Sequence, residues 1–335
     1  MFCDHQAKKF HAVLAQISFR LPAVLATMVA EFVHESPESW AALDLEQHSS
    51  CDWPSELDST AAGFVSSDDG ELYCVGFERD TGVCVVVRLT PEGSQVVGRV
   101  DLPPSNVLAG ASELDRRREA ADSICVSNGR IYAGRNDGHL FASQLGAERS
   151  SAFTCVSTTM PTNGRSCMLR AHASTIFVRQ NMRGRGDNVS VYTWEEAQDI
   201  WRLLFDAKAG ITWFSPVSAS ACVCSLVSGG VQVIARGGFV IWENLSLVLV
   251  DVTFWEGLVF CGYACHPADG PLDAEYAVVD MSAHDGHVLH LPKCKLSRDH
   301  SDMVYLGVGR RVLGWCLIGG LSPDRFVWAQ RFPAA

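Results

Sequence analysis

The chain has 335 residues, of which 47% are hydrophobic and 19% charged. It can therefore bury a large core, and disorder over its whole length is excluded. The formal net charge of −11 disfavours contact with phosphate backbones, and the longest basic run is only Arg116–Arg118. We therefore expect no nucleic acid partner.

The 13 cysteines form no CxxC pair and lie mostly within apolar runs. Buried free thiols in a reducing compartment are the simplest account. Apolar stretches end well short of the roughly 20 residues that a membrane span needs, and the start of the chain does not resemble a secretory signal. The sequence predicts a cytoplasmic or nuclear protein, with the mitochondrion as the alternative because of Lys8, Lys9 and Arg20.

Residues 1–54 are predicted to form a helical segment. Apolar residues alternate steps of four and three, which places them on one helical face: Phe10, Leu14, Ile17, Leu21, Val24 and Met28. Pro22 is unfavourable inside a helix but acceptable in its first turn. Two helices are therefore expected, over about 5–20 and 22–34.

Part of this segment resembles the first half of an F-box, a helical module that docks on the Skp adaptor of ubiquitin ligases. The residues that carry the resemblance are Leu21, Pro22, Leu25, Val29 and Phe32. The stretch that follows is more acidic than an F-box usually is. The resemblance implies a Skp-type adaptor as partner. The alternative is a pair of amphipathic helices that cover the side or bottom of the β-propeller predicted below for residues 60–335.

One pattern recurs throughout residues 60–335. A β-rich run and a turn of small residues precede an apolar–aromatic or apolar pair, and further strands follow each pair. We call the last residue of each pair its anchor. The anchors are Tyr73, Tyr132, Phe177, Val233, Phe260 and Tyr305.

The anchor spacings are 59, 45, 56, 27 and 45 residues. The value of 45 suits a four-stranded propeller blade. A polar helix over 112–122 would account for the long first interval. The short interval requires either a fourth blade without its outer strand or a double role for residues 247–252.

The predicted fold is all-β: a propeller of about six four-stranded blades over 60–335, after the helical segment. Five and seven blades, or a pair of β-sandwiches, are the alternatives. The units resemble PQQ-like, kelch and WD-type propeller repeats in a general way, without the sharp signature of any one family. A clasp between a C-terminal strand near 326–332 and a strand near 60–66 is expected to close the ring.

Within the first repeat, residues 66–73 resemble one Asp-box, the structural turn of sialidase-type propellers, and predict a β-hairpin turn. Between later strands, Arg183 and Arg185 lie in a glycine-rich loop that could bind an acidic partner or phosphate. A solvated hairpin tip is the alternative.

The densest histidine cluster contains His284, His287 and His290, and three imidazoles could hold zinc. However, Asp285-Gly286 is typical of a hairpin turn, and the odd spacing of His287 and His290 places them on opposite faces of a strand. We therefore predict no metal site and no cofactor.

No catalytic motif is present: the chain lacks GxSxG, GxxxxGK[ST], HExxH and a GxGxxG after a strand. The sequence favours a non-catalytic protein–protein interaction scaffold, such as a substrate receptor or a subunit of an assembly. The alternative is a propeller enzyme or small-ligand binder with its site at the central channel.

Overall fold

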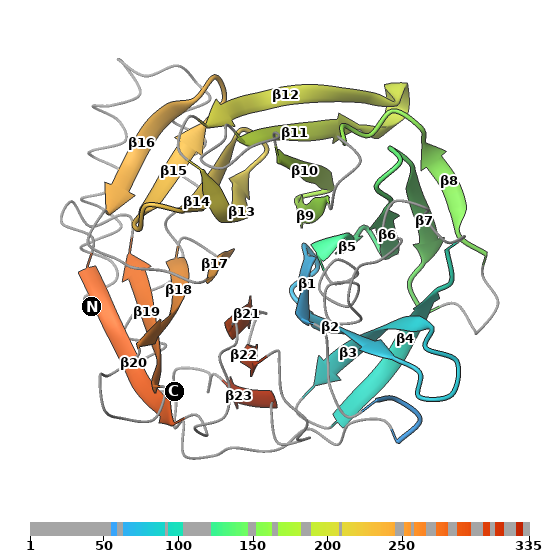
Figure 1. Cartoon of the computed structure of the whole chain (residues 1–335), viewed down its shortest axis with the longest axis horizontal. Helices are drawn as coiled ribbons and strands as arrows, with labels where there is room; N and C mark the ends of the chain where they lie inside the picture. The colour runs from blue at the N-terminus through green and yellow to red at the C-terminus, as the bar shows by residue number, and fades with distance from the viewer. Residues whose placement is uncertain are drawn as a thin grey trace, which may run out of the picture.

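The computed structural model describes most side chains in residues 55–58, 63–90, 93–102, 122–146, 152–162, 167–181, 189–207 and 210–244. Beyond residue 250 it describes the backbone of seven strands between 251 and 330. The predicted helical segment 1–54 lies outside the described residues. Antiparallel sheets arranged around a common centre make up the described part of the chain (Figure 1).

Six groups of consecutive strands form the blades, which we number in chain order. Blades 1 and 2 contain β1 (Gly63–Ser67), β2 (Leu72–Phe77), β3 (Cys84–Thr90), β4 (Gly93–Val100), β5 (Ile124–Ser127), β6 (Arg130–Gly134), β7 (Leu140–Gln144) and β8 (Thr154–Ser157). Blades 3 and 4 contain β9 (Met168–His172), β10 (Thr175–Asn181), β11 (Val189–Glu195), β12 (Ile200–Ala207), β13 (Ile211–Ser218), β14 (Ala221–Leu226), β15 (Val231–Ala235) and β16 (Phe239–Asn244).

Blades 5 and 6 contain β17 (Asp251–Trp255), β18 (Leu258–Cys265), β19 (Asp273–Asp280), β20 (His287–Lys295), β21 (Val304–Val308), β22 (Val312–Leu317) and β23 (Phe326–Gln330). Within each blade the strands pair in chain order, so every connection within a blade is a hairpin. Blade 6 has three strands in the described part of the chain.

The first strands of the blades surround the centre of the ring. Each contacts the first strand of the next blade, in the cyclic order β1, β5, β9, β13, β17, β21 and back to β1 (Figure 1). The predicted β-propeller of about six blades is therefore confirmed. We call these six the inner strands and the last strand of a blade its outer strand.

Burial on both faces of the strands explains why the blades stack. All residues of β2 and all residues of β14 are buried, although strands that cover a core on one side only would alternate. Apolar clusters run from blade to blade: one joins Val75 and Val86 of blade 1 to Ile131 of blade 2. A blade cannot bury two apolar faces alone, and radial stacking buries both.

Four anchors occupy equivalent places and two do not. The repeat predicts equivalent places for all six anchors, and Tyr73, Tyr132, Phe177 and Phe260 do all lie in the second strand of their blade. The prediction is wrong for Val233, which lies in the third strand of blade 4, and for Tyr305, which lies in the inner strand of blade 6.

The position of Val233 explains the irregular spacing. The residue in β14 that pairs with Val233 is Val223, which lies 46 residues after Phe177 and 37 before Phe260. Blade 4 keeps its outer strand, β16, and β17 is simply the inner strand of blade 5. The explanation that blade 4 lacks its outer strand is therefore wrong, while most of residues 247–252, to which the other explanation gave a double role, lie outside the described residues.

The predicted clasp is also wrong. The strand β23 pairs with β22, while β1 pairs with β2 and, in parallel, with β5. Contacts of β21 with β1 bring the last blade against the first. The β1–β5 ladder joins blades 1 and 2 into one eight-stranded sheet.

Candidate functional site

Two arginines and an aspartate lie near the end of the ring where the inner strands begin. Arg170 is in β9, Arg179 is on β10 opposite the first residue of β9, and Asp122 lies two residues before β5. We call these three residues the arginine cluster. It brings together blades 2 and 3 and, through the contacts below, blade 4.

Arg170 is held on several sides. Its Nη1 donates to the carbonyl of Leu169 at 2.8 Å, and its Nη2 lies 3.7 Å from Oδ1 of Asp122. The guanidinium carbon lies 5.9 Å from the ring centres of Trp213 and Phe214 in β13, which is within the range of a cation–π contact. Its orientation is therefore fixed, with 11% of the side chain exposed.

Arg179 joins blade 3 to blade 4. Its Nη1 donates to the carbonyls of Ile211, at 3.2 Å, and of Thr212. Its Nε is buried without a hydrogen-bond partner. Burial lowers the pKa of Arg179 to about 10; the charge of Asp122 opposes this shift and that of Arg170 adds to it. Arg179 is thus a charged group with unused donor capacity in a poorly solvated place.

A polar network at the other end of the inner strands is internally satisfied. Asp68, after β1, accepts a hydrogen bond from the Ser127 hydroxyl at 2.6 Å and from the Ser174 N–H at 2.9 Å. The Ser174 hydroxyl donates to Asn128 at 2.8 Å. The network therefore ties together three blades, and its partners for Asp68 are already in place.

His172 lies at the same end, at the last position of β9. Burial lowers the pKa of His172, and the negative charge of Asp68 opposes that shift. The imidazole is therefore neutral at pH 7, because its ordinary pKa is already below 7. It adds no charge to the Asp68 network at that pH.

The predicted hairpin turn at 66–73 is present and is organised by Asp69. Its carboxylate accepts from the Ser67 hydroxyl at 2.5 Å, the Glu71 N–H at 2.9 Å and the Tyr73 hydroxyl at 2.7 Å. Burial, then this hydrogen bond, raises the pKa of Tyr73. These contacts shape the turn that presents Asp68.

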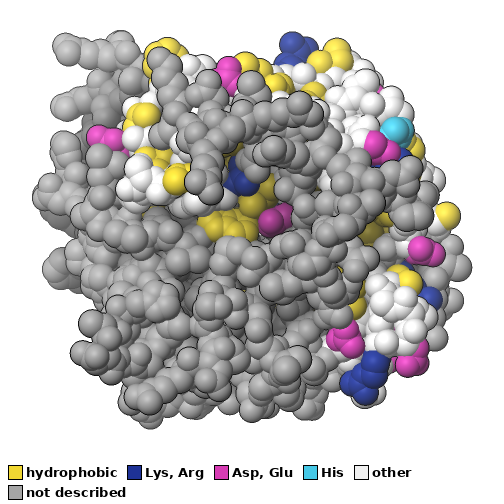
Figure 2. All heavy atoms as spheres, viewed as in Figure 1, with side chains coloured by type: hydrophobic (Ala, Val, Ile, Leu, Met, Phe, Trp, Pro, Cys, Tyr) yellow, Lys and Arg dark blue, Asp and Glu magenta, His cyan; other side chains and the backbone are white. Residues whose placement is uncertain are grey.

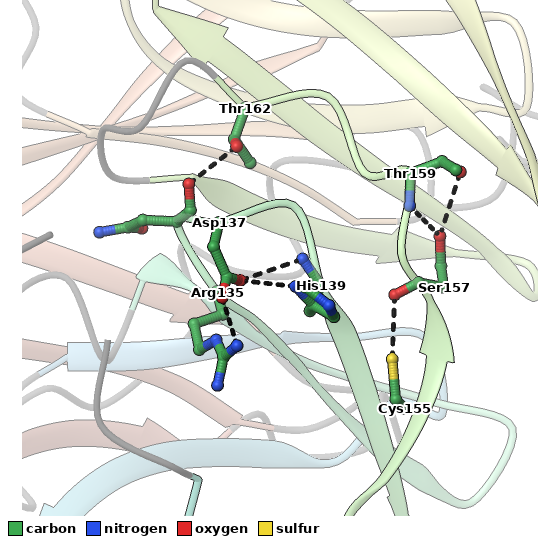
Figure 3. Close-up of polar contacts among 8 residues, drawn as sticks. Arg135, Asp137, His139, Cys155, Ser157, Thr159 and Thr162 are labelled. Carbon is green, nitrogen blue, oxygen red and sulfur yellow. Dashed lines mark hydrogen bonds and ion pairs between the residues drawn. The ribbon is translucent and has the colours of Figure 1, made fainter. Parts of the chain in front are cut away.

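A second polar turn lies between β6 and β7 of blade 2 (Figure 3). Asp137 accepts from Arg135 and contacts Nδ1 of His139 at 2.9 Å. The hydrogen bond from Arg135 lowers the pKa of Asp137 to about 2. Thr162 donates to the Asn136 carbonyl at 2.8 Å, which fastens the turn to the segment after β8.

Exposed apolar side chains gather on the outer strands of blades 3 and 4. The outer apolar strip comprises Ile200, Leu203, Phe239, Val240 and Ile241. The first two are in β12 and the others in β16, and the turn before β16 touches β12 through a 2.8 Å bond from the Gly237 N–H to the Leu204 carbonyl. Apolar side chains are visible on the corresponding rim in Figure 2.

Most of the predicted site residues cannot be placed. The F-box-like positions Leu21, Pro22, Leu25, Val29 and Phe32 lie outside the described residues. Arg183 and Arg185 also lie outside them, in the connection between β10 and β11. His284 is not described, and His287 and His290 are described by their backbone alone, in β20.

Neither residue of the arginine pair was singled out from the sequence. Each nevertheless gave a signal: Arg170 interrupts the apolar residues 168–171, and Arg179 follows the apolar run 176–178 directly. A cation inside a buried strand is expensive unless it is paired. A search of the predicted strands for such charges finds both.

The described residues contain no group of three or more His, Cys, Asp or Glu side chains that could hold a metal ion. In that same part of the chain, no helix is both long and apolar enough to cross a membrane.

No protein-family model matches the chain, and no curated protein matches it. Solved structures do. BamB from Moraxella catarrhalis is 16% identical, with a TM-score of 0.38 over 81% of this chain and 85% of that one. A member of the DUF4221 family from Bacteroides vulgatus is 12% identical, with a TM-score of 0.43 over 83% and 95%. The computationally designed protein Ika8 is 10% identical, with a TM-score of 0.40 over 85% and 98%. The strand topology, rather than these distant likenesses, establishes that the chain is a β-propeller.

Proposed function

We propose that the protein is a non-catalytic interaction scaffold that binds a partner protein through the outer apolar strip. The single observation that carries this proposal is the run of three consecutive exposed apolar residues in β16. Phe239 is 71% exposed, Val240 47% and Ile241 38%. Phe239 and Val240 pair regularly with β15 and, as successive residues of a strand, point to opposite faces, so this strand offers apolar surface on both faces.

The strand is also the last one of its sheet. In the described part of the chain β16 pairs only with β15, so its other edge faces away from the blade. Natural edge strands usually carry charges or proline, which discourage pairing with other chains. The start of β16 carries neither, and this is typical of a surface that another chain covers.

The edge and its apolar side chains together favour a partner with an extended apolar segment. Such a segment would add a strand beside β16, with main-chain hydrogen bonds giving affinity and alternate side chains giving specificity. The neighbouring Ile200 and Leu203 extend the contact onto blade 3. A partner that uses this strip leaves the centre of the ring free.

The test compares the partners of the full-length protein with those of two variants. Phe239→Lys combined with Ile241→Lys places charges along the edge. Val227→Lys is the matched control, because Val227 is equally apolar and 65% exposed but lies in the β14–β15 turn. Affinity purification with quantitative mass spectrometry identifies a partner, and purified components then give its Kd.

The proposal requires one partner that the double variant binds at least roughly tenfold more weakly, as expected for about 1.4 kcal/mol, and that the control binds normally. Equal binding by all three proteins overturns it. Sedimentation at several protein concentrations tests whether the protein associates with itself. If the wild type forms a dimer that the double variant cannot form, a second copy of this chain binds the outer apolar strip. That result would refute the proposal of a different partner protein.

A Skp-type adaptor is a second candidate partner, supported only by the resemblance of residues Leu21 to Phe32 to an F-box. Copurification of such an adaptor, and its loss in Leu25→Asp and Phe32→Asp, is the expected outcome. The outer apolar strip plays no part in that interaction, so the double variant of β16 should keep the adaptor.

A further inference from the structure

We propose that Arg170 and Arg179 bind a small oxyanion, a carboxylate or a phosphate, at the end of the ring where the inner strands begin. The site is separate from the outer apolar strip, so either proposal can fail without the other. It lies between blades 2, 3 and 4, at the arginine cluster defined above.

The first argument is the balance of charge. Among the described residues, two guanidinium groups lie in the cluster with one carboxylate, that of Asp122. The 3.7 Å between Nη2 of Arg170 and Oδ1 of Asp122 is longer than a good hydrogen bond. Counted over these described residues, the cluster has one more positive than negative charge in surroundings that disfavour charge, and an anion would compensate it.

The second argument is the donors that the protein leaves unused. The Nη1 of Arg179 donates to two backbone carbonyls, but its buried Nε has no hydrogen-bond partner. The residue as a whole keeps part of its surface exposed, although burial lowers its pKa. A planar guanidinium whose Nε has no partner within the protein retains a donor that suits an oxygen of a carboxylate or phosphate.

The third argument is that Arg170 is already oriented. Its Nη1 donates to the carbonyl of Leu169, and the rings of Trp213 and Phe214 lie 5.9 Å from the guanidinium carbon, near the limit of the cation–π range. A donor that is fixed before binding loses little conformational entropy when the ligand arrives. Cation–π contacts leave its in-plane N–H groups available.

The opposite end of the inner strands shows what a purely structural cluster looks like in this fold. There Asp68 receives two hydrogen bonds at 2.6 and 2.9 Å. In the arginine cluster, by contrast, the Nε of Arg179 is buried without a hydrogen-bond partner.

Isothermal titration calorimetry with the full-length protein tests the site. The probes are inorganic phosphate and succinate, each against sodium chloride at the same ionic strength. We expect saturable binding of at least one probe. Phosphate alone would assign a phosphate site and succinate alone a carboxylate site, and both results support the proposal.

Two variants connect binding to the arginines. Arg170→Lys keeps the charge near Asp122 and Trp213 but loses the planar fork, and Arg179→Met removes the second charge. Each should weaken binding roughly 10- to 100-fold, the loss expected for a hydrogen bond between charged groups. Arg202→Met is the control, because Arg202 is exposed and pairs with Glu195 on the rim.

No saturable signal with either probe would overturn the proposal, and so would unchanged binding in Arg170→Lys. If Arg179→Met does not fold, Arg170→Lys still decides, because its charge and most of its packing are retained. Circular dichroism checks that each variant is folded before titration.

Discussion

The carboxylate of Asp68 in blade 1 accepts a hydrogen bond of 2.9 Å from the backbone N–H of Ser174, which lies 106 residues later in blade 3. The same oxygen accepts a second bond, of 2.6 Å, from Ser127 of blade 2. One side chain therefore connects three consecutive blades. These residues are far apart in the sequence, so the two hydrogen bonds form only when the three blades are packed side by side.

Replacing Asp68 should destabilise the ring. Asp68→Ala removes the acceptor of two hydrogen bonds and leaves the Ser174 N–H without it, so we expect a loss of about 2–4 kcal/mol in the free energy of unfolding. Urea unfolding followed by tryptophan fluorescence measures this loss. Asp80→Ala, at an exposed aspartate in the β2–β3 turn, should change it by less than about 0.5 kcal/mol. Equal losses in the two variants would contradict the role given to Asp68.

Asp137 should stabilise the protein in a pH-dependent manner. Its folded pKa of about 2 lies below the ordinary value of 3.8, so its contribution is complete above about pH 4 and is lost as the pH falls towards 2. Because the pair with Arg135 is partly exposed, we expect about 1 kcal/mol or less. The difference in unfolding free energy between wild type and Asp137→Asn, measured from pH 6 downwards, should be constant at first and then shrink. A difference that grows on acidification would refute this assignment.

Among the described cysteines, Cys155 should react first. Its side chain is exposed, whereas Cys74, Cys125, Cys222 and Cys224 are buried. Burial also raises the pKa of the Cys125, Cys222 and Cys224 thiols, which removes their reactive thiolate at neutral pH. Limited alkylation of the native protein with iodoacetamide, followed by peptide mass spectrometry, should show Cys155 modified well before these four. Faster labelling of any of the four would contradict the burial described here.

Gly134 should tolerate no side chain. A Cβ atom at this position in β6 would lie 2.9 Å from Sγ of Cys167 and 3.2 Å from Cδ1 of Leu169, both in blade 3 or directly before it. Gly134→Ala should therefore cost about 1–3 kcal/mol through overpacking of the joint between blades 2 and 3. Adding Cys167→Ala should recover part of the loss, which a double-mutant cycle of thermal or urea unfolding measures. If the changes in unfolding free energy of Gly134→Ala and Cys167→Ala are strictly additive, the two side chains are not in contact.

The sequence predicts the architecture well because local chemistry repeats. Turn residues and apolar pairs mark the second strands at Tyr73, Tyr132 and Phe177 without any knowledge of their neighbours. The pattern misleads in blade 4, where Gly230 and Val231 open the third strand with the same residue types that open a second strand elsewhere. Strand order within a blade follows from hairpins, but the parallel contact of β1 with β5 joins residues 59 positions apart and has no local signal.

The candidate site was harder to predict for a related reason. The site depends on contacts of Arg170 with Asp122, Trp213 and Phe214, which belong to other blades than Arg170 and Arg179. Their separations along the chain reflect loop lengths, so no spacing rule brings them together. The exposure of Phe239 is equally invisible in the sequence, since apolar β16 resembles any buried strand.

Because of the ladder between β1 and β5, the joints between neighbouring blades are not all of the same kind. In the described part of the chain it is the only joint at which inner strands share main-chain hydrogen bonds, through Ser66 with Cys125 and Ser67 with Val126. We therefore expect the first two blades to behave mechanically as one double-width wedge. Blades 3 and 4 are joined at their outer strands by the bond from the Gly237 N–H to the Leu204 carbonyl, without a ladder between their inner strands in the described part of the chain. Any widening of the ring should be taken up at joints without a ladder, with blades 1 and 2 moving together.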